Sequence, residues 1–432
     1  MSDPDARPEA GADAEPGSAA GSDRRPSRRL VLGSMTAAAA AAVPLLGTAS
    51  SAAAASARRS PAERRSPAGK PSPAEGRPSM ELVYVNTWKG TRIYGAWFDT
   101  ADGSLTAIGP VGEANADWAV THPALPILYV ATMEVGGVVD TFRINAATGA
   151  LTKTGELSTG GTGLGGGGVS YVGIDRPSNT LLATNFEDGF TAAVPISQTG
   201  KLGAPTSRVQ DSGSGPNPRQ AGPHPHHAEV DPTGRYALVA DFGADRVFVL
   251  PFDRATRTLS SGGATAPSAY AAAPGSGPRR VAFHPGGRTL YLLSELSADI
   301  QTLAWSPRDG LLTHRQTVGL TTPDFTGTKS ASDLAVSADG RFVYAGDRGE
   351  NSLVVLAVDP KTELLGIVQR VPCGGATPWG FSLHPSGRWL LVANEASSTV
   401  NVFAVDQGSG RLTDTGTWVS VPNPDSITFF RA

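Results

Sequence analysis

A histidine-rich segment near the middle of the chain, PHPHH at residues 223–227, contains side chains that can do chemistry. It holds three of the seven histidines of the chain. Imidazole carries a proton near neutral pH, and it also binds metal ions and anions. Side chains alternate along an extended segment, so we expect His224 and His226 to share one side and His227 to point away.

Three uses of the pair His224 and His226 fit the sequence. A His-x-His pair can bind zinc, with Asp241 or Glu295 as a third ligand. A buried pair can instead be structural, hydrogen-bonded beneath a loop. The third use is proton transfer or ligand binding in an active site. Because no spaced set of acidic or histidine companions stands out, we predict an active or ligand-binding site without metal or other cofactor.

The composition limits the classes of protein to which the chain can belong. A formal net charge of −3 over 432 residues gives no electrostatic reason to expect nucleic acid as a partner. With 52 glycines, 34 prolines and 17% charged residues, the chain suits many short strands and turns better than long helices. Cys373 is the only cysteine, which excludes an intramolecular disulfide and a cysteine metal site.

The first 80 residues carry the pattern of an export signal. Two arginine pairs, in DRRPSRR at 23–29, precede an Ala-rich apolar run at 30–49 and small residues ending at 55–57. Arg28-Arg29 and the residues after them resemble the twin-arginine pattern. We therefore predict an export signal at 1–57, read by the twin-arginine machinery. Residues 58–80 have almost no apolar side chain and predict a disordered linker.

An export signal of this kind predicts that the mature protein is secreted or extracytoplasmic. After cleavage of the signal, we expect no stable insertion in the membrane. The alternative is an uncleaved membrane anchor, because the apolar run is long enough to span a bilayer. Alanine contributes little hydrophobicity, and Gly33, Ser34, Thr36 and Pro44 dilute the run further. The cleaved signal is therefore the favoured interpretation.

From residue 81 onward the chain repeats one pattern of short apolar strands. The segments 230–252, 283–305, 336–358 and 383–405 each combine a tight turn, an apolar strand, a polar residue and another alternating strand. The polar residue after the second strand recurs seven times, at Asn86, Thr132, Asn185, Asp241, Ser294, Asp347 and Asn394. The successive spacings are 46, 53, 56, 53, 53 and 47 residues.

Seven units of this length predict an all-β fold: a seven-bladed β-propeller of four-stranded antiparallel blades over residues 81–432. The first repeat lacks its innermost strand, whereas residues 422–430 match the start of a repeat and then stop. We expect this C-terminal strand to complete the first blade and so close the ring.

The propeller topology predicts which residues meet. The innermost strand of each blade lines the central channel, and it begins at the face where the second strand ends. His224 and His226 precede or begin the innermost strand of the fourth blade, and Arg279 that of the fifth. Glu295 and Arg348 follow the second strands of the fifth and sixth blades. These side chains should therefore surround one opening of the channel.

We predict structural roles for four of the five other histidines. We expect His227 to turn into the blade, away from the channel opening. His122, His284 and His384 recur with the repeat in His-Pro turns and are predicted to be turn residues at the opposite face.

Several short motifs in a fixed order resemble the lactonase family of seven-bladed propellers. That family includes propeller-type 6-phosphogluconolactonases and is similar in fold to carboxymuconate-lactonizing enzymes. The motifs are Arg219-Gln220, Pro223-His224-Pro225-His226, Asp241-Phe242-Gly243-Ala244-Asp245, Gly277-Pro278-Arg279, Phe283-His284-Pro285, Ser294-Glu295-Leu296, Asp347-Arg348-Gly349 and the closing Val421-Pro422-Asn423-Pro424. Trp379 departs from the pattern, since the family has an arginine there.

The resemblance implies opening of a lactone by water without a metal or cofactor. It implies His226 or His224 as the proton carrier, with Glu295 as the acid/base or orienting partner. It also implies substrate binding by Arg279, Arg348, Arg219 and Asp241, all of which lie in the matching motifs. The predicted partner is a small sugar or carboxylated lactone, and the protein is expected to be a monomer. The alternative is an extracellular binding module that keeps a vestigial lactonase funnel.

Overall fold

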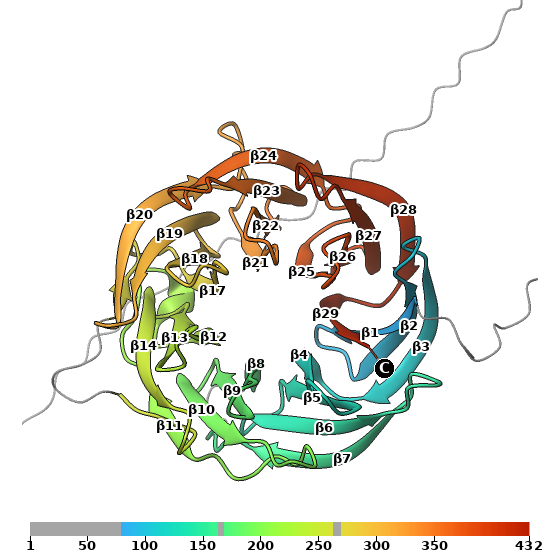
Figure 1. Ribbon diagram of the computed structural model, residues 1–432, viewed down its shortest axis with the longest axis horizontal. Helices are drawn as coiled ribbons and strands as arrows, with labels where there is room; N and C mark the ends of the chain where they lie inside the picture. Colours follow the sequence, from blue (N-terminus) through green and yellow to red (C-terminus); the bar gives the residue numbers. More distant parts are fainter. Residues whose placement is uncertain (1–78, 163–167, 262–268, 432) are drawn as a thin grey trace, which may run out of the picture. The chain divides into compact units, whose positions relative to one another are not determined.

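Seven antiparallel sheets stand in a ring around a central channel (Figure 1). The computed structural model describes residues 79–162, 168–261 and 269–431. The predicted export signal lies outside these residues, as does the predicted linker except for its last two positions. Strand β1 begins at Met80, so the propeller starts one residue before the predicted boundary.

The chain fills the ring blade by blade and enters each blade at its innermost strand, except that the innermost strand of the first blade is the C-terminal strand. Blade one consists of β29 (Pro424–Phe430), β1 (Met80–Thr87), β2 (Arg92–Asp99) and β3 (Leu105–Glu113). Blade two consists of β4 (Ala116–Thr121), β5 (Ile127–Thr132), β6 (Val138–Ile144) and β7 (Leu151–Ser158). Blade three consists of β8 (Val169–Asp175), β9 (Thr180–Asn185), β10 (Phe190–Pro195) and β11 (Ser207–Gln210). The fourth consists of β12 (Pro225–Val230), β13 (Tyr236–Asp241), β14 (Arg246–Asp253), β15 (Thr258–Leu259) and β16 (Tyr270–Ala271).

The last three blades are regular four-stranded sheets. Blade five consists of β17 (Pro278–Phe283), β18 (Thr289–Ser294), β19 (Asp299–Ser306) and β20 (Leu311–Gly319). Blade six consists of β21 (Ala331–Val336), β22 (Phe342–Asp347), β23 (Ser352–Val358) and β24 (Leu365–Pro372). Blade seven consists of β25 (Pro378–Leu383), β26 (Trp389–Asn394), β27 (Thr399–Val405) and β28 (Leu412–Ser420). In blade four, β15 and β16 both pair with β14 and share its outer edge. The predicted all-β propeller is thus confirmed.

The two ends of the propeller meet in one blade, as predicted. β29 pairs antiparallel with β1, with Val83 opposite Phe429 and Val85 opposite Ile427. Figure 1 shows this C-terminal strand on the channel side of β1. The last strand therefore supplies the innermost position that the first repeat lacks.

Apolar side chains fill the spaces between neighbouring blades. Each of seven buried clusters joins two adjacent sheets, and the cluster between blades seven and one contains Phe98, Trp389 and Ile427. Both faces of every blade are covered in this way, which explains why the middle strands read as continuous apolar runs. The hydrophobic effect thus holds the ring together blade against blade.

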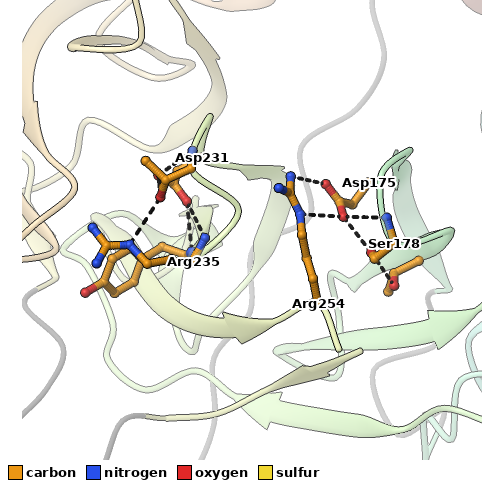
Figure 2. Close-up of polar contacts among 8 residues, drawn as sticks. Asp175, Ser178, Asp231, Arg235 and Arg254 are labelled. Atoms are coloured by element: carbon orange, nitrogen blue, oxygen red, sulfur yellow. Dashed lines mark hydrogen bonds and ion pairs between the residues drawn. The ribbon is translucent and has the colours of Figure 1, made fainter. Parts of the chain in front are cut away.

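Polar contacts reinforce the turns at one face of the propeller. Arg254, which follows β14, reaches across to Asp175 at the end of β8, with N–O distances of 2.7 and 3.0 Å (Figure 2). In the next turn, the Asp231 carboxylate accepts hydrogen bonds from the backbone amides of Thr233 and Arg235. These contacts fix the face away from the predicted site.

The histidines of the repeated turns are structural, as predicted. Nδ1 of His284 accepts a hydrogen bond from the amide of Gly286, and Nδ1 of His384 accepts one from the amide of Ser386. His122 accepts two backbone amides in the same way. Within the described part of the chain, no helix is long and apolar enough to cross a membrane.

Candidate active site

The innermost strands share an irregularity that positions the site. In each of the seven blades the innermost strand carries one residue more than its partner near the start, a β-bulge. In five blades a single residue is left unpaired, namely Asp117, Ser170, His226, Arg279 and Trp379. A bulge bends the strand and turns its extra side chain to a new direction.

All five of these unpaired residues line one cavity at the face where the second strands end. We call it the mouth cavity, and its volume is about 430 Å³. Its lining residues are Trp88, Asp117, Met133, Gly168, Ser170, Phe186, Glu187, Pro218, Arg219, Ala221, His224, His226, Arg279, Glu295, Arg348 and Trp379. The structure thus brings together six of the predicted site residues, and the seventh, Asp241, lies outside the lining.

Glu295 is the centre of a cluster of arginines on one wall of the mouth cavity. Its Oε2 lies 3.0 Å from Nε of Arg279 and 2.9 Å from Nη2 of Arg348, while Oε1 lies 2.7 Å from Nη1 of Arg219. The Glu295 side chain is only 5% exposed. Although burial opposes ionisation, the charges of Arg348, Arg279 and Arg219 lower the pKa of Glu295 to about 2.

This geometry separates the two roles that the sequence left open for Glu295. A carboxylate with so low a pKa holds almost no proton at neutral pH, so it is a poor acid or base there. Instead it fixes the directions of the guanidinium groups around it. Arg279 also donates to the carbonyl oxygen of Ser332, and Arg348 donates to that of Ala331 at 3.1 Å. The arginines are therefore held in place before any ligand binds.

His226 and His224 face the cavity from blade four and pack against Phe186, which lies in the turn between β9 and β10 of blade three. The His224 ring stacks on Phe186 with centroids 4.5 Å apart, and its Nδ1 lies 2.8 Å from the Phe186 carbonyl oxygen. His226 meets the same phenylalanine edge-on, and its buried Nδ1 has no hydrogen-bond partner in the described structure. Burial, followed by the charges of Arg279 and Arg280, holds the pKa of His226 well below its ordinary value. The imidazole is therefore neutral at pH 7.

His227 does not turn into the blade, contrary to the prediction. The bulge between Pro225 and His227 interrupts the strict alternation on which that prediction relied. His227 lies in a second cavity of the channel, of about 320 Å³, with Trp118, Arg280 and Asp333. Its ring lies 4.1 Å from that of Tyr171. We call this the inner cavity; it extends toward the His-Pro turns of the opposite face.

Asp241 lies beneath the site and not in the cavity. It is fully buried, and Oδ1 accepts the backbone amides of His224 and Ala244, each at 2.8 Å. Asp241 therefore positions the segment that carries His224, and the structure does not place it in contact with a substrate. Its sequence position at the end of a second strand could not distinguish these two roles.

Most residues of the other wall of the cavity were not predicted from the sequence. Trp88 and Trp379 lie with ring centroids 4.9 Å apart, and the Arg348 guanidinium lies 4.6 Å from the centre of the Trp379 ring. Asp117 and Ser170 face the cavity from blades two and three. The signal that could have found all of these residues is their shared place at the start of an innermost strand or the end of a second strand.

Among the residues that the structure describes, no three His, Cys, Asp or Glu side chains form a group that could hold a metal ion. The residues considered for zinc have other contacts: Glu295 binds arginines and Asp241 binds backbone amides.

Comparison with known proteins identifies the family. Residues 83–429 match the family described as lactonase, 7-bladed beta-propeller. The chain belongs to this lactonase family. A 6-phosphogluconolactonase of Bacillus subtilis is 31% identical over 353 residues, which cover 81% of this chain and 98% of that protein.

Solved structures of similar proteins agree with this propeller lactonase assignment. The structure of a periplasmic gluconolactonase of Pseudomonas aeruginosa is 30% identical, with a TM-score of 0.73, and the match covers 82% of this chain and 99% of that one. A protein of Lactobacillus plantarum is 27% identical with a TM-score of 0.74, covering 82% of this chain and 100% of that one.

The mouth cavity of this propeller lactonase contains groups suited to the attack of water on a cyclic ester. Water must lose a proton as it attacks the carbonyl carbon, and a neutral imidazole can accept that proton. Negative charge then develops on the carbonyl oxygen, and fixed guanidinium groups stabilise it. His226, Arg279 and Arg348 offer these two functions within one cavity.

Proposed function

We propose that this protein hydrolyses a small sugar lactone in the mouth cavity, without a metal, after export from the cytoplasm. The observation that carries the proposal is the set of arginines fixed by Glu295 in the cavity that also holds His226. In this mechanism His226 takes the proton of the attacking water. Arg279 and Arg348 stabilise the oxyanion, and Glu295 keeps both guanidinium groups in position.

The size and the aromatic wall of the cavity support a sugar-sized substrate. A volume of about 430 Å³ is within the range of small-molecule sites. The paired rings of Trp88 and Trp379 offer an apolar surface against which the C–H face of a sugar ring can pack. Hydroxyl groups of the substrate would then meet polar side chains such as Ser170 and Glu187.

The charge balance of the cavity supports a substrate without a phosphate group. Arg219, Arg279 and Arg348 all contact the Glu295 carboxylate. The lining also contains the acidic residues Asp117 and Glu187. Glu295 balances only one of these three positive charges, and the carboxyl groups of Glu187 and Asp117 offset part of the rest. The positive charge left for a phosphate dianion is therefore small.

A panel of lactones tests this proposal. The purified protein should open glucono-δ-lactone faster than the spontaneous reaction, as measured by acid release at constant pH. The rate should survive EDTA, and the 6-phosphorylated lactone should give a lower kcat/KM than the free sugar lactone. A muconolactone-type substrate probes the carboxylated alternative. Absence of hydrolysis above background for every lactone would contradict the proposal and favour the binding module.

Export rests on the sequence alone and is proposed on that basis. The support is the order of paired arginines, Ala-rich run and small residues in 1–57. Changing Arg28 and Arg29 together to lysine should retain the protein in the cytoplasm, as followed by cell fractionation. Unchanged secretion of this variant would contradict use of the twin-arginine route.

A further inference from the structure

Two carboxyl groups lie on neighbouring innermost strands, on the side of the ring away from Glu295, and the mechanism above does not use them. Asp117 is the unpaired residue of the bulge in β4, and Asp425 lies in the corresponding bulge of β29. Ser426 joins the two segments, since its Oγ lies 3.0 Å from the Asp117 carbonyl oxygen and 3.1 Å from Oδ1 of Asp425. Both carboxyl groups therefore belong to neighbouring innermost strands.

The surroundings of these carboxyl groups favour a shared proton. Asp425 is 1% exposed, and its Oδ2 has no hydrogen-bond partner in the described structure. The arginines of blade five, whose charges act on Asp117, are paired elsewhere, Arg279 with Glu295 and Arg280 with Asp333. Two buried carboxylates that lack a paired cation repel each other, so one of them retains a proton.

Asp117 also faces the substrate space. It lines the mouth cavity together with His226, Arg279 and Arg348. Lactone opening needs two proton transfers, one from the attacking water and one to the ring oxygen that leaves. A neutral His226 can perform the first transfer, but the arginines are poor acids and Glu295 is ionised. For the second transfer, the imidazolium of His226 and the Asp117 carboxyl group are the two donors that remain, and they lie on different blades around the cavity.

We propose that Asp117, sharing a proton with Asp425, is the general acid that protonates the leaving ring oxygen. This inference rests on the proposed lactone hydrolysis. The water oxygen forms a bond to the carbonyl carbon while a water proton moves to His226. The bond between that carbon and the ring oxygen then breaks, and the ring oxygen takes the proton from Asp117. Return of the proton from His226 to the Asp117–Asp425 pair through water restores the site.

The charged groups around the pair predict a pH dependence. Burial raises the pKa of Asp117 to about 7, against the lowering effect of Arg279 and Arg280. Burial and the charge of Asp117 raise the pKa of Asp425 well above its ordinary value. Because the acid must be protonated to act, kcat should fall as the pH rises through the pKa of the pair.

Substitution of each carboxyl group tests the inference. Asp117→Asn should lower kcat for a lactone by about 10²–10⁴-fold. The same variant should lose less than tenfold with the matching thiolactone, because a thiolate leaves without help from an acid. Asp425→Asn should move the alkaline limb of the rate profile to lower pH by about one unit or more, since the repelling charge is gone. Glu113→Gln, which removes an exposed carboxyl group at the end of the outer strand β3, should keep the alkaline limb of the wild type.

An independent readout follows the proton itself. Carbon-13 NMR of the aspartate carboxyl groups should show, at pH 6, a protonated carboxyl signal that changes in both Asp117→Asn and Asp425→Asn. Any signal of the separate buried aspartate Asp211, whose pKa burial also raises, should stay the same in these variants. Two ionised carboxylates at pH 6 would overturn the inference. If the wild type hydrolyses the lactone and Asp117→Asn has the same ratio of lactone to thiolactone rates as the wild type, this inference is overturned and the proposed function still stands. Absence of wild-type turnover would overturn the proposed function and this inference together.

Discussion

At the scale of single residues, Glu295 shows how one side chain organises a site without taking part in proton transfer. A single buried carboxylate contacts three arginines from blades five and six and from the loop before blade four. Removing its charge leaves Arg279 and Arg348 crowded together, with side chains 4% and 9% exposed. A buried charge that loses its partner is strongly destabilising.

Glu295→Gln should therefore lower the free energy of unfolding by about 3–5 kcal/mol, as measured by urea denaturation at pH 7. Asp309→Asn is the control, because the exposed pair of Arg308 and Asp309 should contribute less than about 1 kcal/mol. Equal losses in the two variants would contradict the role of Glu295 as an anchor.

The same contact predicts an acid dependence with a definite sign. The pKa of Glu295 is about 2 in the folded protein, below the ordinary value of 4.5. Ionised Glu295 thus contributes stability that is fully present above pH 4.5 and is lost as the pH falls toward 2. The stability difference between wild type and Glu295→Gln should shrink over that range.

At the scale of elements, the sequence predicted the strands and their order but not the β-bulge at the start of each innermost strand. The repeat, the strand order and the closing strand all followed from apolar patterning and spacing. The bulges left no such trace, because the unpaired residues share no type: Asp117, Ser170, His226, Arg279 and Trp379. A bulge is an extra residue on one strand between two successive pairs with the partner strand, so it depends on how the two strands pair and not on the type of that residue.

The bulges also explain why the site was predicted only in part. Topology alone placed His226, Arg279, Glu295 and Arg348 at one opening of the channel. The direction of His227 required the register of β12, and the contribution of Asp117 required that of β4. Neither register can be read from residue types in a single sequence.

The closing strand β29 gives a prediction at this scale. Ile427 is 5% exposed and packs in the core between blades seven and one. Ile427→Ala should lower the free energy of unfolding by about 2–5 kcal/mol, because a cavity opens where the two ends of the chain meet. Val135→Ala is the control, since Val135 is 65% exposed. If Ile427→Ala lowers the free energy of unfolding no more than Val135→Ala does, packing of β29 is not needed to hold the ring closed.

At the scale of the whole molecule, the channel is divided between two cavities with different lining. Two neighbouring residues of β12 line different cavities: His226 lines the mouth cavity, and His227 lines the inner cavity. The consecutive arginines Arg279 and Arg280 are divided in the same way. The proposed chemistry belongs to the mouth cavity alone, so the two histidines form a matched pair for testing it.

The most direct test of this account is the turnover of a sugar lactone by His226→Ala and His227→Ala, with circular dichroism to establish that both variants are folded. Loss of the proton acceptor should lower kcat of His226→Ala by about 10²–10⁴-fold. His227→Ala should retain kcat within a few-fold, because His227 faces the inner cavity. Retention of full turnover by folded His226→Ala, or an equal loss in both variants, would contradict hydrolysis in the mouth cavity.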